Sequence, residues 1–229
     1  MSSAPDLPVL YVEGKDDISV INALLSRHGI DTDQGRKVLK IKDLGNWSDV
    51  LDAMPDAIKA STGHPVGFVV DIDVNVTDRW NAVRNRLAQF NLSPPATCPP
   101  DGYFDKLPDF PHQFGVWLMP DCQTDNTKLE NLIETLLPDN DPLWPHAKDS
   151  VTTAVTFVDD ANALITDQTD HWDRFGDVDR VKAEVHTWLA WQREPGVPLG
   201  AAINDHILRH DSQEALNFLD WIKRLYGLH

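Results

Sequence analysis

The chain has 229 residues, of which 41% are hydrophobic, so it is long enough to bury one large core. The net charge of −16 argues against tight, nonspecific binding to phosphate backbones, which depends on many Lys and Arg contacts. The charge does not exclude a nucleic-acid substrate, because a bound divalent cation or a basic partner would invert the local electrostatics.

Two further properties narrow the class of protein. Cys98 and Cys122 are the only cysteines, so neither a disulfide scaffold nor a four-cysteine zinc site can form, and we expect both thiols to be reduced. The first residues, MSSAPDLP, have neither the basic start nor the apolar stretch of a signal peptide. Apolar runs such as 66–70 are far shorter than the roughly 20 residues of a membrane helix. We therefore expect a cytoplasmic protein without a membrane partner.

The first part of the chain alternates between strand and helix patterns. Residues 9–12 predict a buried strand, and apolar residues over 18–25 recur at helical spacing until His28 and Gly29. A half-buried strand is predicted over 37–44 and a helix over 46–61, with Pro55 bending or dividing that helix. The apolar run 66–73, which ends in acids, is typical of a central parallel strand.

The same alternation continues to residue 137. The predicted elements are a helix over 77–90, a strand over 114–120 and a helix over 127–137. Between them, residues 91–113 carry six prolines and are expected to be irregular, with one short hairpin around Tyr103 and Phe104. This order predicts an α/β core over 1–137 with a mainly parallel sheet and helices on both faces.

The remainder, residues 138–229, predicts a mixed linker followed by a helical extension packed on the core. One helix is expected near 150–164, and three more over 177–192, 199–208 and 212–227.

Acidic residues follow three of the predicted strands. Glu13 comes after the first strand, Asp71 and Asp73 end the central one, and Asp121 follows the strand over 114–120. Ligands of parallel α/β sheets bind beyond the carboxyl ends of the strands, and alternation along a strand would point Asp71 and Asp73 the same way. Grouped carboxylates repel one another unless a cation holds them. Oxygen ligands without Cys or a His pair favour Mg²⁺ or Mn²⁺ over zinc.

The motifs VEGKDD at 12–17 and DID at 71–73 resemble the Toprim domain of topoisomerases, primases and overcoming-lysogenization-defect nucleases. The resemblance implies a Toprim-like Rossmannoid fold in which Asp71 and Asp73 hold Mg²⁺ and Glu13 acts in proton transfer or metal binding. Glu13 and Asp17 also reproduce an ExxxD spacing found in those nucleases. Asp17 and Asp121 would then complete a second metal position.

The same resemblance extends to two lysines and a partner. The nucleases have a late lysine that stabilises developing phosphoryl charge, which here would be Lys182; a solvated lysine is the simpler interpretation, and it applies equally to Lys15. Glu130 would face either the site or solvent. Together with VVDID, GVWLMPD and LENLI, the segment KAEVHTWLAWQREPGVPLGAAI is similar to a Toprim-like family of unknown function often encoded beside ATPases. An ATPase partner is therefore expected.

Three functional hypotheses remain open from the sequence. The first is a metal-dependent nuclease that acts on nucleic acid. The second is a noncatalytic Toprim-like module that docks on an ATPase or nucleic-acid complex. The third is a phosphatase, because VVDIDVN at 69–75 partly resembles the first motif of haloacid dehalogenases, in which one Asp is a nucleophile.

Overall fold

A computed structural model describes residues 7–30, 38–61, 63–108, 110–167, 169 and 171–228. Its centre is a five-stranded sheet with the strand order β2-β1-β3-β5-β4. Four strands are parallel, and β4 runs antiparallel to β5. The strands are β1 (Val9–Val12), β2 (Lys40–Asp43), β3 (Val66–Asp71), β4 (Tyr103–Asp105) and β5 (Phe114–Met119).

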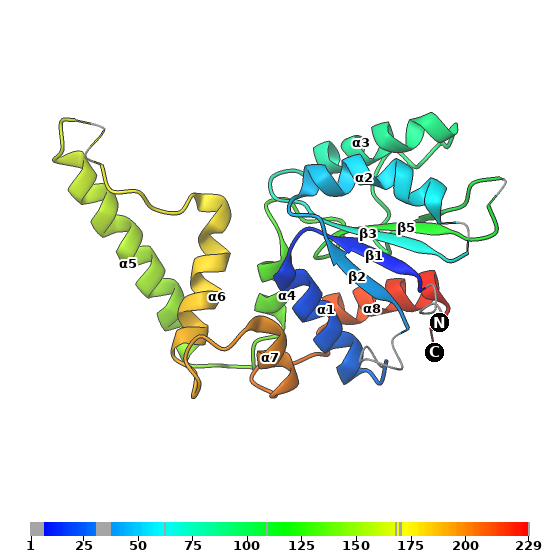
Figure 1. The fold of residues 1–229 in the computed structure, drawn as a ribbon. Coiled ribbons are helices and arrows are strands. Elements are labelled where there is room, and N and C mark those ends of the chain that lie inside the picture. Colours follow the sequence, from blue (N-terminus) through cyan, green and yellow to red (C-terminus); the bar gives the residue numbers. More distant parts are fainter. Residues whose placement is uncertain are drawn as a thin grey trace, which may run out of the picture.

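The central strands are apolar on both sides because helices cover both faces of the sheet. Every residue of β5 is buried, as are the first five residues of β3, which explains their continuous apolar runs. Helices α2 and α3 lie over one face, and α1 and α8 lie over the other (Figure 1). The predicted α/β class, with a mainly parallel sheet and C-terminal helices, is confirmed.

Each of the predicted helices has a counterpart in the structure. The helices are α1 (Lys15–Arg27), α2 (Trp47–Ala60), α3 (Val76–Leu87), α4 (Leu129–Thr135), α5 (Leu143–Ala163), α6 (Arg180–Ala190), α7 (Leu199–Asn204) and α8 (Gln213–Tyr226), with short 3-10 turns at Ala88–Phe90 and Asp177–Asp179. Asn46 and Asn75 cap α2 and α3, since each side-chain oxygen accepts a backbone N–H three residues later. Helix α2 runs through Pro55 without dividing.

The last helix belongs to the central core. Trp221 packs against Trp117 of β5 with ring centroids 5.8 Å apart, and the Tyr226 hydroxyl donates to the Val9 carbonyl at 2.8 Å. Gly67 permits this approach, because a Cβ there would lie 2.6 Å from the Tyr226 oxygen. The chain therefore returns to its first strand, and the predicted domain boundary after residue 137 stays a prediction.

Helices α5 and α6 lie side by side and project from the rest of the molecule as an arm (Figure 1). The helix predicted near 150–164 starts earlier, at Leu143, so the predicted start was wrong. The reason is local, because Asp141 Oδ1 accepts the N–H groups of Leu143 and Trp144 at 2.8 and 2.9 Å. Across the described ranges, no helix has the length and apolarity to cross a membrane.

Candidate functional site

An open cleft of about 450 Å³ lies at the carboxyl edge of the sheet. The ends of β1 and β3, the start of α1, the start of α4 and one side chain of α6 form its walls. This edge is where parallel α/β sheets bind ligands, because strand ends and helix starts meet there. The lining residues are Glu13, Gly14, Lys15, Asp16, Asp17, Gly45, Asp71, Asp73, Lys128, Leu129, Glu130 and Lys182.

The acids of the first and third strands meet directly. The backbone N–H of Asp71 donates to Glu13 Oε1 at 2.7 Å, which joins the ends of β1 and β3. Asp71 Oδ1 accepts the N–H of Leu129 at 3.1 Å, so the same residue also ties β3 to the start of α4. Acids 58 positions apart in sequence thus share one edge of the sheet, as predicted.

Asp17 reaches the cleft from the first turn of α1. Its Oδ2 accepts the N–H of Gly14 at 2.9 Å, and the side chain is buried. A Cβ at position 14 would lie 3.3 Å from that oxygen, so glycine leaves room for the carboxylate. The Glu-Gly pair and the acid three residues later therefore form one compact turn.

Asp73 lies outside the strand. Strand β3 ends at Asp71, and Asp73 takes a left-handed φ of 59°, so strand alternation does not extend to it. Its Oδ2 accepts from Arg79 Nη2 at 2.7 Å, and its Oδ1 lies 3.9 Å from Lys128 Nζ. Asp73 lines the cleft, but cations of the chain already neutralise it.

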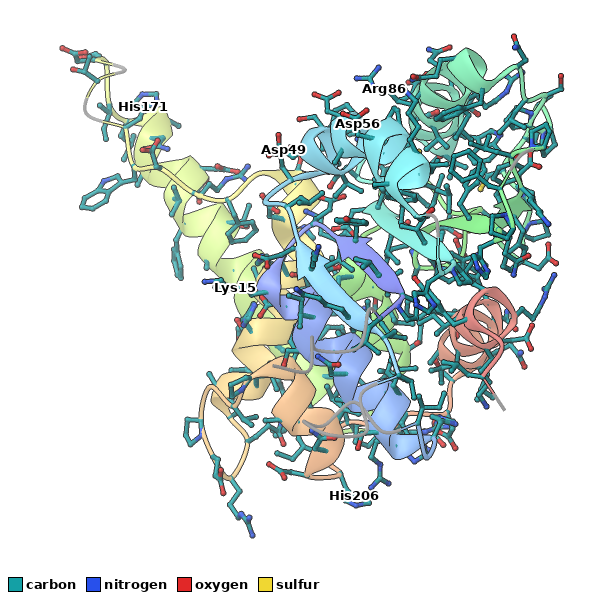
Figure 2. The ribbon with its side chains drawn as sticks, turned by 45° about the vertical axis from the view of Figure 1, so that its right-hand side comes forward. Lys15, Asp49, Asp56, Arg86, His171 and His206 are labelled. Atoms are coloured by element: carbon teal, nitrogen blue, oxygen red, sulfur yellow. The ribbon has the colours of Figure 1, made fainter. Side chains whose placement is uncertain are left out.

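The far wall of the cleft carries a buried acid and two lysines. Glu130 is buried, and its Oε1 lies 3.4 Å from Lys182 Nζ, whose side chain is half exposed. Lys128 Nζ lies 2.8 Å from Asp179 Oδ1. Lys15 stands at the solvent-facing start of α1 (Figure 2). Lys182 thus lines the cleft, and its expected role at a phosphoryl group stays a prediction.

Burial first, and then mutual repulsion, raise the pKa values of the acids in the cleft. Burial, and then the charges of Asp73 and Asp17, raise the pKa of Glu13 to about 7. The hydrogen bond that Glu13 accepts from the Asp71 N–H acts in the opposite direction and lowers this pKa. Burial and the charges of Glu130 and Asp16 raise the pKa of Asp17 to about 6. Burial and the charges of Asp17 and Glu13 hold the pKa of Asp71 well above its usual range.

Asp121 does not line the cleft. Its Oδ1 accepts the N–H groups of Gln123 and Thr124, each at 2.9 Å, and its Oδ2 accepts the Thr124 hydroxyl at 2.6 Å. These bonds hold the turn after β5, which is the ordinary use of an Asp at the start of a turn. The structure therefore does not bring this residue to the predicted second metal position.

Within the described part of the chain, no three His, Cys, Asp or Glu side chains are arranged to hold one metal ion together. The carboxylates of Glu13, Asp17 and Asp71 each use one oxygen to accept a backbone N–H. As they lie, any cation would be held by one or two of them together with water, which is how Mg²⁺ is commonly bound.

Sequence reasoning missed two cations of this region. Arg79 is the fourth residue of α3 and forms an ion pair with Asp73. Lys128 directly precedes α4 and forms an ion pair with Asp179. Lys128 and Glu130 lie at the start of α4, the first helix after β5, and this position is the signal for them because helix starts line this edge. No sequence signal singles out Arg79 from the other basic residues of its helix.

The fold and the cleft together define an α/β protein with a carboxylate-rich cleft at the carboxyl edge of its sheet. Residues 8–227 match the model of one family, described as a protein of unknown function (DUF3226). The match spans nearly the whole chain, so the chain belongs to that family. No curated protein and no solved structure matches it.

Proposed function

We propose that this protein is a Mg²⁺- or Mn²⁺-dependent phosphodiesterase that acts on nucleic acid at the acidic cleft. One observation carries the proposal. Glu13, Asp17 and Asp71 are crowded into the cleft, and none of the three forms an ion pair with a Lys or Arg of the described chain. Acids that lack a cation of their own and repel one another are a fitting site for a divalent ion.

The donor set also indicates which ion would bind. Only carboxylate and backbone oxygens are offered by the acids at the strand ends, and Cys98 and Cys122 are not among the residues that line the cleft. Oxygen ligation favours Mg²⁺ or Mn²⁺ over zinc. The resemblance of VEGKDD and DID to Toprim motifs supports the same assignment.

Each residue of the cleft has a role in this proposal. Asp71 and Asp17 would hold the cation together with water, and Glu13 beside Asp71 would move a proton at the reacting oxygen. When bound, the ion would polarise a phosphoryl oxygen and acidify water. Lys182 is half exposed at the opposite wall, so its ammonium group can contact a phosphoryl oxygen. Asp73 would position Arg79.

Calorimetry and a cleavage assay test the proposal with one matched pair of variants. Asp71→Asn keeps an oxygen that can accept the Leu129 N–H but removes the charge, and Asp56→Asn removes an exposed charge on α2 (Figure 2). We expect Asp71→Asn to weaken Mn²⁺ binding at least about tenfold, as loss of one carboxylate ligand does, and to abolish cleavage of labelled DNA or RNA. Asp56→Asn should match wild type. Absence of cleavage by wild type, or equal cleavage by Asp71→Asn, would contradict the proposal.

The arm formed by α5 and α6 favours a second function, docking on a protein partner such as the expected ATPase. Phe157 of α5, Leu164 directly after it and Trp172 in the segment between α5 and α6 are all exposed. The chain after α5 folds back, since Trp172 N–H donates to Asn162 Oδ1 at 2.7 Å. Large exposed apolar side chains gathered on one projection are typical of protein interfaces.

Metal binding separates the two functions. If calorimetry detects no Mg²⁺ or Mn²⁺ binding, and a stoichiometric ATPase partner is lost on Phe157→Ser, the protein is a docking module rather than a nuclease.

A further inference from the structure

A small hollow of about 200 Å³ adjoins the acidic cleft. It lies between the start of α2, the residues after β3 and the first turns of α3, and Trp47, Ile72, Val74 and Arg79 are among its walls. The Trp47 side chain is 38% exposed and Val74 is 60% exposed. Two large apolar side chains are therefore presented to solvent beside the site of the proposed chemistry.

Arg79 backs the indole ring of Trp47. The guanidinium carbon lies 3.9 Å from the ring centroid, within the range of a cation–π contact. Arg79 is only 9% exposed and is held in place by its bond to Asp73. Its buried Nε has no hydrogen-bond partner among the described residues. The Trp47 ring is thus fixed on one face by a cation and still partly open to solvent.

The hollow and the cleft lie next to each other, although no residue lines both. Gly45, two residues before Trp47, lines the cleft, as does Asp73, the neighbour of Val74. The Asp73–Arg79 ion pair therefore connects the two spaces. A ligand that occupied both would have an anionic group near the carboxylate-held cation and a flat, apolar group against Trp47. A nucleotide has both of these parts.

We infer that the hollow binds one nucleobase of a single-stranded nucleic acid, stacked on Trp47, while the adjoining phosphate lies in the acidic cleft. The inference rests on the proposed function and names its substrate class. Bases of a duplex are stacked on one another and cannot enter such a hollow, so the strand must be single or locally unpaired. Stacking uses the face that every base has, so we expect little base preference.

The test is the affinity of a fluorescein-labelled oligothymidylate, measured by fluorescence anisotropy with Ca²⁺ in place of Mg²⁺. Stacking on an aromatic side chain contributes enough that Trp47→Ala should weaken binding about 5-fold to 150-fold. Trp47→Phe keeps an aromatic ring and should weaken it less. The matched control is Trp191→Ala, because Trp191 is 42% exposed and lines neither the cleft nor the hollow. It should bind like wild type.

Several outcomes would overturn the inference. The first is that Trp47→Ala and wild type bind the single strand with equal affinity. The second is that Trp47→Ala weakens the binding of a duplex as much as that of the single strand. The third is that wild type does not bind the single strand at concentrations up to on the order of 100 μM, the weak end of nonspecific affinity. Retained cooperative unfolding of Trp47→Ala would show that a loss is not due to misfolding.

The result is separable from the test at Asp71. If Asp71→Asn cleaves like wild type but Trp47→Ala binds the strand weakly, the proposed catalytic role fails and the base site stands. If Asp71→Asn is inactive but Trp47→Ala binds like wild type, the base site alone fails.

Discussion

Glu13 makes the stability of the metal-free protein fall as pH rises. Its pKa is about 7 in the folded chain and ordinarily 4.5, so the native state keeps a proton that the unfolded chain releases. The resulting stability is fully present below pH 4.5 and is lost as pH rises through about 7. Each pKa unit corresponds to about 1.4 kcal/mol, so Glu13 alone should lower the free energy of unfolding by about 2.5 kcal/mol between pH 5 and pH 8.

Glu13→Gln tests this contribution directly. The amide keeps the size of the side chain and an oxygen that can accept the Asp71 N–H, but it cannot titrate. We expect the variant to lose about 2.5 kcal/mol less stability than wild type between pH 5 and pH 8, measured by urea denaturation at 25 °C with EDTA present. Asp17 changes in the same direction, because its pKa is also raised, to about 6. Asp56→Asn, on the exposed side of α2, should follow wild type.

A parallel pH dependence in Glu13→Gln and wild type would refute the reasoning, because it would show that Glu13 is not held protonated by burial.

Added Mg²⁺ extends the test. Protons and the cation compete for the same carboxylates, so Mg²⁺ should stabilise wild type more at pH 8 than at pH 5. At a concentration 100 times its dissociation constant, the ion would add about 2.7 kcal/mol. If Mg²⁺ stabilises Asp71→Asn as much as wild type, Asp71 does not bind the cation.

Two further tests concern parts of the fold that do not line the cleft. Gly67→Ala should destabilise the protein by about 1–3 kcal/mol in urea denaturation, because its Cβ would lie within 2.8 Å of Tyr226 and Leu225. The control is Gly176→Ala, which should be neutral or slightly stabilising, since no atom lies within 4 Å of the added Cβ. A neutral Gly67→Ala would contradict the close packing of α8 on the sheet. Asp121→Ala should lower stability by about 1 kcal/mol, because the hydrogen bonds that hold its turn are lost. The variant should leave the Mn²⁺ affinity measured by calorimetry unchanged. A weaker affinity would show that Asp121 does contribute to the cation site.

The parts of the site that the sequence predicted are those fixed by strand direction. Continuous apolar runs identified β3 and β5, and the parallel arrangement placed Glu13 and Asp71 at one edge. Periodicity needs no knowledge of contacts, so it was sufficient for these residues. Asp17 was instead singled out by the ExxxD spacing of the resemblance, and the turn after β1 brings it to the cleft.

What the sequence did not predict depends on individual backbone angles and side-chain partners. Asp73 leaves the strand pattern because of its left-handed φ of 59°, and its pairing with Arg79 follows from that geometry. Asp121 was predicted at the site because it follows a strand, but the three hydrogen bonds of its own turn hold it elsewhere. These bonds join residues only two to six positions apart, but they depend on backbone angles and side-chain partners that periodicity does not report.

The acids of the cleft divide into two groups, and the division bears on function. Asp73 and Glu130 each have a cation of the chain within ion-pair distance, at 2.7 and 3.4 Å. Across the residues that the structure describes, Glu13, Asp17 and Asp71 have none, although burial raises the pKa of each. An unpaired buried carboxylate destabilises the fold, and three together destabilise it further by mutual repulsion. If stability alone determined these positions, amides or apolar residues would serve better. A bound divalent ion would offset this cost, and in a chain of net charge −16 it would also give a phosphate a positive group to approach.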